Sequence, residues 1–332
     1  MNILVTGGAG YIGSHTCKIL HKNNYKPITI DNLSTGNEWA VKWGPLIKGN
    51  INNQELIKSV INEYDIKAVI HFAANAYVGE SIEHPRKYFN NNIINSLKFL
   101  NSVIDSKIKY FVFSSSCATY GIPKTIPIDE NHQCKPINPY GETKLIFEKI
   151  LKSYGNAYNL NWISLRYFNA AGADPNSEIG ESHSPETHLI PLAIKCALKQ
   201  KNELKIFGTD YPTPDGTAIR DYIHVDDLAA AHKLSIDKLV NGCKSKVINL
   251  GNEKGYSIYE IINVIEKISK SEIIKKETAR RKGDPPSLIA SSKKAKEILD
   301  WKPKYKTIED IIKTAWEWEL NKHSNIFNSE KY

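Results

Sequence analysis

The first thirteen residues hold the feature that most restricts the fold of this chain. The apolar run Ile3-Leu4-Val5 is typical of a buried strand, and Gly7, Gly10 and Gly13 follow it at intervals of three. A helical pattern begins directly afterwards. A glycine-rich turn between a strand and a helix lets backbone N–H groups approach a pyrophosphate, with the positive end of the helix dipole behind it. A tight turn with positive φ explains one glycine but hardly three, so these residues predict a dinucleotide site.

An acidic residue stands at the end of the next predicted strand. Residues 27–30 form a short apolar run, and Asp31 follows, about 18 residues after Gly13. At this place in a dinucleotide-binding fold, a carboxylate accepts hydrogen bonds from the adenosine ribose hydroxyls. The same carboxylate repels a 2′-phosphate, so Asp31 favours NAD over NADP.

The first half of the chain alternates strand and helix patterns. Apolar runs predict strands at residues 46–47, 68–72 and 110–113. Between these runs, residues 56–61 and 90–105 have the pattern of helices. Such alternation predicts an α/β fold with a doubly wound parallel Rossmann sheet. Ligands of such sheets bind at the carboxyl ends of the strands. The segments expected there are Gly7, Asp31, Asn50, residues 72–74 and residues 114–116.

The pattern changes after about residue 168, and 332 residues allow two domains. We expect an NAD-binding domain over residues 1–168, with returning segments near 220–250, and a smaller α+β substrate domain over residues 169–332. Residues 172–188 and 209–216 are loop-rich, and residues 247–250 resemble a strand that returns to the first sheet. Helix starts are indicated by the capping box of Ser257 and Glu260 and by Thr307 with Asp310. Because residues 247–250 are expected to return to the first sheet, we expect the two domains to be interleaved.

Composition excludes several classes of function. The formal net charge is +8, but the lysines are scattered and form no basic stripe with aromatic residues, so no nucleic-acid partner is expected. No apolar run approaches the ~20 residues of a membrane helix, and no signal-type leader precedes the first strand. The five cysteines are odd in number and lack metal-type spacing, which predicts reduced thiols, a cytoplasmic location and no metal site.

A pair of residues with catalytic potential lies near the middle of the chain. Tyr140 and Lys144 share one face of a predicted helix, because they are four positions apart. A nearby ammonium favours the phenolate, and an oxidised nicotinamide adds positive charge, so the tyrosine can act as a base near neutral pH. Pro139 suits the start of this helix and Gly155 its end.

The strand before this helix ends in three serines, Ser114, Ser115 and Ser116. A hydroxyl there can hydrogen-bond both the tyrosine and a substrate oxygen, but the sequence pattern alone does not choose among the three. His71 and His224 are interpreted as partners of backbone groups and not as bases. No base accompanies Cys117, so that residue is expected only to pack.

A family resemblance rests on seven motifs, at residues 7–13, 31–34, 78–81, 114–121, 138–144, 166–173 and 220–227. Together they resemble the extended short-chain dehydrogenase/reductase superfamily, in which the glycine turn has this spacing. Residues 185–191 and 281–284 narrow the resemblance to its UDP-glucose 4-epimerase family. The match runs from Met1 to about Trp318.

The resemblance implies roles for individual residues. Tyr140 is the implied base, Lys144 its electrostatic partner and ribose ligand, and Ser116 its hydrogen-bonding partner. The remaining implied NAD contacts are Gly7, Gly10, Tyr11, Ile12, Gly13, Asp31, Asn32, Leu33, Ser34, Asn50, Ile51, Phe72, Ala73, Ala74, Ala76, Asn91 and Phe168. The UDP-sugar contacts are Ser116, Tyr140, Asn169, Leu189, Phe207, Arg220, Arg281, Asp284 and Leu288. Two arginines suit a pyrophosphate, and Phe207 can stack on uracil.

The implied activity is the interconversion of UDP-glucose and UDP-galactose in galactose metabolism, by transient oxidation at C4 with tightly bound NAD, in a homodimer. Two positions depart from the family pattern. Ala76 replaces a lysine of some members, and Asn50 replaces a frequent aspartate that contacts adenine. Leu288 occupies a position that can gate an N-acetyl group, so UDP-N-acetylhexosamines stay open as substrates.

Three rival functions share parts of this sequence pattern. A nucleotide-sugar 4,6-dehydratase typically carries an Asp-Glu pair after the active-site Ser/Thr, where this chain has Cys117 and Ala118. An ordinary reductase would release NADH. A non-catalytic NAD-sensing protein would have no need of Ser116, Tyr140 and Lys144.

Overall fold

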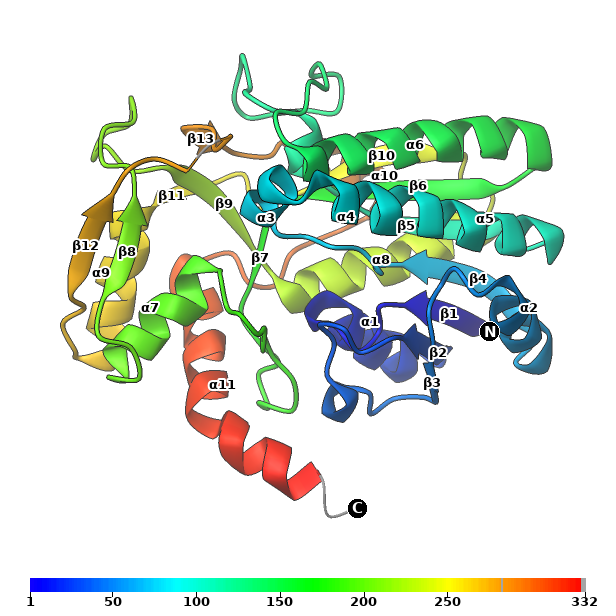
Figure 1. The fold of residues 1–332 in the computed structure, drawn as a ribbon, viewed down its shortest axis with the longest axis horizontal. Coiled ribbons are helices and arrows are strands. Elements are labelled where there is room, and N and C mark those ends of the chain that lie inside the picture. Colours follow the sequence, from blue (N-terminus) through cyan, green and yellow to red (C-terminus); the bar gives the residue numbers. More distant parts are fainter. Residues whose placement is uncertain (282, 330–332) are drawn as a thin grey trace.

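A computed structural model describes residues 1–281 and 283–329, with side chains as far as residue 322. Its larger part is a seven-stranded parallel sheet in the order β10-β6-β5-β4-β1-β2-β3 (Figure 1). The strands are β1 (Asn2–Thr6), β2 (Lys26–Asp31), β3 (Leu46–Lys48), β4 (Ile66–His71), β5 (Tyr110–Ser116), β6 (Asn161–Tyr167) and β10 (Lys246–Leu250). This order reverses direction between β1 and β4, the switch point at which doubly wound sheets bind ligands. The predicted fold class is confirmed.

Helices cover both faces of this sheet, because successive side chains of each strand point to opposite sides. Ile3 and Val5 of β1 pack into the core beneath α1 (Tyr11–Lys22), α8 (Val225–Val240) and α10 (Lys293–Leu299). Leu4, between them, packs into the core beneath α2 (Gln54–Glu63), α5 (Ser96–Asp105) and α6 (Pro139–Tyr158). The short apolar run at the first strand therefore belongs to two cores at once.

The smaller part of the molecule lies beyond the carboxyl ends of these strands (Figure 1). A four-stranded sheet joins β7 (Asn169–Ala171), β9 (Ile219–His224), β11 (Gly255–Ser257) and β13 (Ser287–Leu288), and a second sheet pairs β8 (Leu204–Phe207) with β12 (Lys275–Thr278). Its helices are α7 (Leu189–Ala197), α9 (Ile258–Ser269) and α11 (Ile308–Ser329). The predicted capping box of Ser257 and Glu260 begins α9.

The chain crosses between the two parts more than once. After β9 it enters α8, which covers the large sheet, and β10 then pairs in parallel with β6, as predicted for residues 247–250. The next strand, β11, pairs with β9 in the smaller part. The division at residue 168 stays a prediction. Segments after this residue belong to both parts of the molecule, so the two parts are separate in space but not in sequence.

Two helix predictions need correction. The catalytic helix α6 continues through Gly155 to Tyr158 and ends at Asn159, which has a left-handed φ of 56°. Gly155 is glycine for a different reason: a Cβ there would lie 2.9 Å from the carbonyl oxygen of Leu160. The helix predicted for residues 90–105 begins as a π-helical turn, η2 (Asn90–Asn95), before α5.

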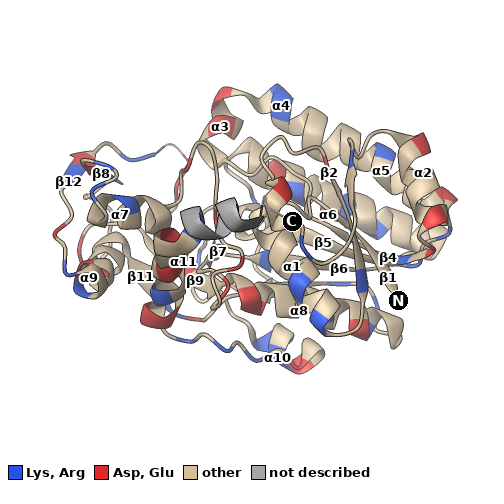
Figure 2. Cartoon of the chain, turned by 90° about the horizontal axis from the view of Figure 1, so that it is seen from below, with Lys and Arg blue, Asp and Glu red and all other residues tan. Residues whose placement is uncertain are grey.

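Shorter elements surround the carboxyl ends of the strands. They are η1 (Glu38–Ala40), α3 (Val78–Glu83), α4 (Pro85–Phe89) and η3 (Cys117–Thr119). Figure 2 shows basic residues mixed with acidic ones along the helices, as expected of a solvated surface. Among the described residues, no helix is both long and apolar enough to cross a membrane. All five cysteines are free thiols.

A buried histidine in α8 predicts a pH-dependent stability. His232 packs against Phe72 with ring centroids 4.6 Å apart, and burial lowers its pKa to about 4. The unfolded chain has a histidine pKa of about 6.5 and binds this proton first as the pH falls. The neutral ring therefore supports the fold above about pH 6.5, and this support is lost towards pH 4.

We expect His232→Leu to gain thermal stability relative to wild type as the pH is lowered from about 7 to about 5, because leucine does not titrate. Thermal unfolding midpoints of both proteins at the two pH values measure this. An equal difference in midpoint at both pH values would contradict the prediction.

Candidate active site

The carboxyl ends of the large sheet and the smaller part enclose one cavity of about 1150 Å³. Typical small-molecule pockets measure about 300–1,000 Å³, so this cavity has room for more than one small ligand. Its walls come from the glycine turn, the ends of β2, β4 and β5, the start of α6 and the segments around Arg220 and Asp284. The sequence prediction that these strand ends face one crevice is confirmed.

The glycine turn lies at one end of the cavity. Gly7 has a φ of 71°, which favours glycine. A Cβ on Gly13 would lie 2.2 Å from the carbonyl oxygen of Gly7, so the helix packs directly on the turn. Gly10 is the N-cap of α1, and no side chain caps that end. Backbone N–H groups of the first turn are thus directed at the cavity without a side-chain acceptor, which suits an anionic ligand.

Asp31 stands next to this turn at the end of β2. Its carboxylate accepts hydrogen bonds from the backbone N–H groups of Ala9 at 3.1 Å and Leu33 at 2.8 Å. A carboxylate has about four acceptor sites, so further hydroxyl donors can be accommodated. Beside it, the Asn32 side chain donates to the Asn50 side chain at 2.7 Å. With asparagine at position 50, the side-chain amides of Asn32 and Asn50 form a pair, and both residues line the cavity.

Tyr140 and Lys144 lie one turn apart on α6 and both line the cavity. Lys144 Nζ lies 5.7 Å from the Tyr140 ring centroid and donates a 2.7 Å hydrogen bond to the Ser114 carbonyl oxygen. Burial lowers the pKa of Lys144 to about 7 and raises the pKa of Tyr140 to about 12, against a smaller lowering effect from Ser116. Burial thus dominates the pKa of this phenol in the ligand-free cavity, and the lowering expected when the oxidised nicotinamide is bound stays a prediction.

The three serines at the end of β5 have different partners. Ser114 Oγ pairs with the Tyr167 hydroxyl, and Ser115 Oγ donates to the buried carboxylate of Glu148 at 2.6 Å. Ser116 Oγ accepts from the Ala118 backbone at 3.1 Å, and its hydroxyl hydrogen stays available beside Tyr140. Of the three serines, Ser116 is therefore the one beside Tyr140, and its implied role stays a prediction.

Buried Asn92 is a residue that the sequence analysis missed. Its side chain accepts from the Asn75 backbone N–H at 2.8 Å and donates to the Asn75 carbonyl at 3.0 Å and to Thr143 Oγ1 at 3.1 Å. It therefore fastens the loop after β4 to the helix that carries Lys144. It lies in the π-helical turn η2, a distortion that is frequent at functional sites. Within a run of three asparagines, no spacing signal distinguishes it.

Arginine and aspartate side chains lie at the opposite end of the cavity. Arg220 pairs with the Asp284 carboxylate and donates to the Pro285 carbonyl at 2.7 Å. The guanidinium carbon of Arg281 lies 4.0 Å from the centroid of the Phe207 ring. This end therefore carries excess positive charge next to an aromatic face.

The structure brings together nearly all predicted site residues. The cavity lining includes every residue predicted to contact cofactor or substrate except Leu33 and Phe207. The Leu33 N–H instead supports Asp31, and Phe207 lies under Arg281. The roles assigned to single residues stay predictions.

The two histidines left out of catalysis are engaged elsewhere. His71 pairs with Thr6 at 2.7 Å and with Ser96 at 3.1 Å, and burial lowers its pKa to about 3. His224 accepts from the Asp226 backbone as N-cap of α8.

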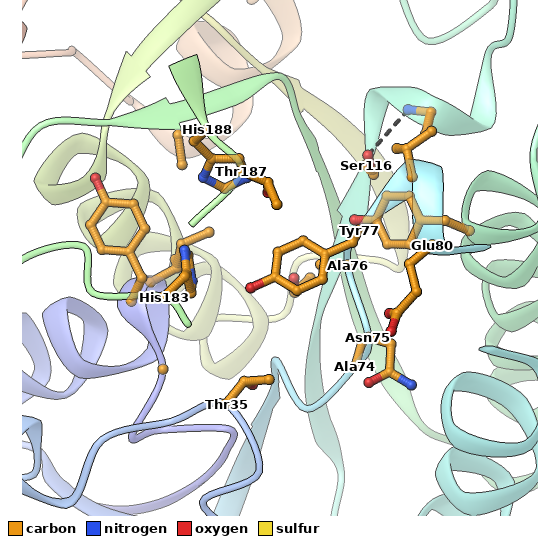
Figure 3. A pocket seen from close by; sticks show the side chains of 18 of the residues that line it. Thr35, Ala74, Asn75, Ala76, Tyr77, Glu80, Ser116, His183, Thr187 and His188 are labelled. Carbon is orange, nitrogen blue, oxygen red and sulfur yellow. Dashed lines mark hydrogen bonds between the residues drawn. The ribbon is translucent and has the colours of Figure 1, made fainter. Parts of the chain in front are cut away.

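Further residues line the cavity without having been predicted. Figure 3 shows Tyr77 and His183 on facing walls, and their ring centroids lie 6.1 Å apart. Others are Thr35, Thr187 and His188. The motif at residues 185–191 drew attention to the last two, but nothing in its spacing indicated a chemical role.

The fold and this site are those of a dinucleotide-binding enzyme, and sequence comparison supports the same class. The profile of the NAD dependent epimerase/dehydratase family matches residues 3–251. The chain belongs to this family.

Within this family, the chain is similar to several UDP-glucose 4-epimerases. It is 48% identical to the UDP-glucose 4-epimerase of Rhizobium meliloti (strain 1021) over 322 residues, which are 97% of this chain and 98% of that protein. The structure resembles UDP-glucose 4-epimerase from Brucella ovis in complex with NAD, with a TM-score of 0.92, 47% identity and coverage of 95% and 97% of the two chains. The enzyme from Bifidobacterium longum, in complex with NAD+ and UDP, has a TM-score of 0.92 and 36% identity and covers 98% of this chain and 99% of its own.

Proposed function

We propose that this protein is an NAD-dependent UDP-glucose 4-epimerase that interconverts UDP-glucose and UDP-galactose. The observation that carries the proposal is the position of Ser116, Tyr140 and Lys144 between the glycine turn and the arginine end of one cavity. Full-length relatives with this activity support it.

The residues around the glycine turn fit NAD. The uncapped N-terminus of α1 suits its pyrophosphate, and the Asp31 carboxylate suits a ribose with free 2′- and 3′-hydroxyls. Phe72 and Phe168 offer apolar surface in the cavity. When bound, NAD supplies the acceptor and donor of the hydride at sugar C4.

The chain's own groups move the proton. Tyr140 takes the proton of the sugar 4-hydroxyl and later returns it to the 4-keto sugar, and Ser116 hydrogen-bonds the reacting oxygen. Lys144 adds positive charge beside Tyr140, which favours the phenolate that accepts this proton. Epimerisation needs non-stereospecific return of the hydride, so the keto sugar must turn over within the cavity while UDP stays held.

The arrangement does not favour a 4,6-dehydratase. The residues after Ser116, Cys117 and Ala118, form the short helix η3 and bring no carboxylate to this position. Burial raises the pKa of the Cys117 thiol to about 12, so it offers no acid–base group near neutral pH.

An assay without added cofactor tests the proposal. Purified protein loaded with NAD and then freed of unbound NAD should convert UDP-galactose to UDP-glucose over many turnovers, because no net redox change occurs. An enzyme that makes only one product per bound NAD, with NADH accumulating, would be a reductase and not an epimerase.

A separate prediction concerns Arg281, at the end of the cavity that carries the arginines. Arg281→Ala should raise KM for UDP-galactose about 10- to 100-fold, because hydrogen bonds to charged groups contribute about 1.5–3 kcal/mol. The content of bound NAD should stay unchanged, since Arg281 lies at the far end of the cavity. Steady-state kinetics measure KM, and the NAD absorbance of the purified protein measures the bound cofactor. The matched control is Arg280→Ala, which removes a guanidinium that pairs with Asp210 outside the cavity lining.

A cytoplasmic location and a homodimeric assembly belong to the same proposal. The free thiols and the family resemblance support them. Sedimentation of the purified protein measures the assembly.

A further inference from the structure

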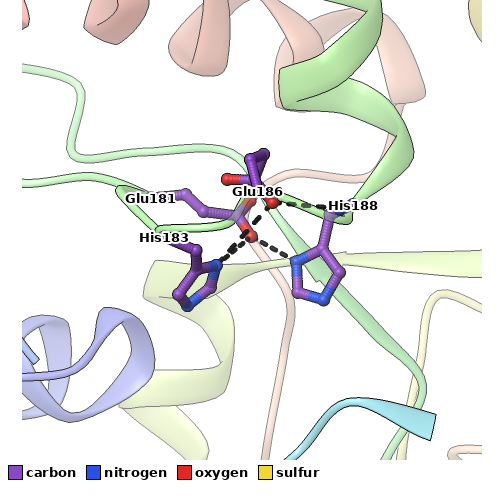
Figure 4. Close-up of side chains that lie close together, drawn as sticks. All are labelled: Glu181, His183, Glu186 and His188. Atoms are coloured by element: carbon purple, nitrogen blue, oxygen red, sulfur yellow. Dashed lines mark hydrogen bonds and ion pairs between the residues drawn. The ribbon is translucent and has the colours of Figure 1, made fainter. Parts of the chain in front are cut away.

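Four side chains capable of binding a metal converge in the loop before α7. Glu181, His183, Glu186 and His188 each offer one nitrogen or oxygen atom, and these atoms all lie within 4.8 Å of one another (Figure 4). They alternate along one short segment, so a single loop presents all of them. No residue of this cluster had been assigned a chemical role above.

The cluster contains two carboxylates that are removed from water. The side chains of Glu181 and Glu186 are 6% and 4% exposed. Within the part of the chain that the structure describes, their ion-pair partners are His183 and His188, with no lysine or arginine. Buried carboxylates need a compensating charge, which either two protons on the imidazoles or one divalent cation can provide.

The orientation of His183 distinguishes these two possibilities. Its Nδ1 atom is fully buried and lies 3.1 Å from Glu181 Oε1 and 3.8 Å from Glu186 Oε1. It nevertheless has no partner with hydrogen-bond geometry. A protonated imidazole would be expected to direct its N–H at one carboxylate, as His188 does at Glu181, whereas the His183 nitrogen faces two carboxylates without hydrogen-bond geometry to either, as a metal ligand would.

We propose that Glu181, His183, Glu186 and His188 bind one divalent transition-metal ion, with zinc the best match. Two imidazole nitrogens and two carboxylate oxygens are a donor set that zinc accepts in four-coordinate geometry. Magnesium and calcium prefer six or more oxygen ligands and fit it poorly. Tetrahedral zinc, with bonds of about 2.0–2.2 Å, has ligand atoms about 3.3–3.6 Å apart, so small side-chain rotations complete the site.

The ion stiffens the wall of the cavity. The His183 ring meets Tyr11 of the glycine turn and Tyr77 edge-on, at 6.3 and 6.1 Å between centroids. The Glu181 carbonyl accepts from the Trp318 indole of α11 at 2.9 Å. A metal at the cluster therefore fixes the loop between the cofactor end of the cavity and the C-terminal helix.

Metal titration of the purified protein tests the proposal independently of enzymatic activity. The protein is dialysed against a chelator and titrated with ZnCl2 by calorimetry, and with CoCl2 to observe the visible absorption of tetrahedral cobalt. We expect one ion per chain, a tetrahedral cobalt spectrum and a rise in the thermal midpoint with zinc, because the ion binds the folded state.

Three variants and one control identify the ligands. His183→Ala, Glu181→Gln and His188→Ala should each lose the cobalt spectrum and the equimolar zinc binding. His188 is the most exposed of the four, at 47%, so its variant is expected to fold even if a buried ligand's variant does not. The control His21→Ala removes an exposed histidine from the end of α1 and should bind as wild type does. Wild-type protein that binds no zinc, or binding that survives in His188→Ala, overturns the proposal.

Discussion

Tyr140→Phe should lower kcat for UDP-galactose by about 10²- to 10⁴-fold, the usual contribution of a positioned general acid or base. The change removes one oxygen and keeps the ring that packs beside Lys144. NAD should stay bound, because the glycine turn and Asp31 are unaffected. Steady-state kinetics measure the first effect, and the absorbance of the purified protein measures the second.

A large rise in KM with little change in kcat would contradict this role, since it would place Tyr140 in binding and not in proton transfer. A matched control is Tyr64→Phe, which removes a phenol from the end of α2, outside the cavity lining. The pH profile adds a second measure. Burial raises the pKa of Tyr140 to about 12 in the ligand-free cavity. We therefore expect activity near neutral pH to depend on the positive charge of the oxidised nicotinamide, which favours the phenolate.

Gly13→Ala should weaken NAD binding by about tenfold or more. The new methyl group would lie 2.2 Å from the Gly7 carbonyl oxygen and 2.8 Å from the Gly8 Cα, which are backbone atoms that cannot rotate away. Overpacking of this kind costs about 1–3 kcal/mol, occasionally more, and about 1.4 kcal/mol corresponds to one decade of affinity. The NAD content of the purified variant and its calorimetric affinity after cofactor removal measure the loss.

Gly79→Ala is the matched control for this change. It adds the same methyl group in α3, where nothing lies within 4 Å of the new atom. Gly79 also lines the cavity, but the added methyl group meets no protein atom there, so the thermal midpoint should be that of wild type. If Gly13→Ala retained normal NAD affinity, the close approach of α1 to the turn would not be a requirement of the cofactor site.

Much of the fold follows from local sequence patterns. The run Ile3-Leu4-Val5 predicts a strand buried on both faces, and its side chains do enter two different cores. The position of Asp31 after its strand and of Tyr140 and Lys144 on one helix follow from periodicity in the same way. These features need only neighbours in the sequence, so a single sequence suffices to predict them.

Features that depend on distant segments could not be predicted. The end of α6 depends on Asn159, whereas Gly155 makes room for the chain that follows the helix. The three serines of β5 look alike in sequence and differ only through Tyr167, Glu148 and Tyr140. The burial that raises the Tyr140 pKa is likewise a property of the assembled cavity.

The repeated crossing of the chain between the two sheets also restricts how such an enzyme can change. Residues 1–168 alone would lack β10, α8 and α10, so the part of one apolar sheet face that α8 and α10 cover would lie open to water. The smaller part of the molecule therefore cannot be replaced as one continuous segment, either by recombination or by protein engineering. New sugar preferences have to arise by substitution within the loops that line the cavity, on an otherwise unaltered frame.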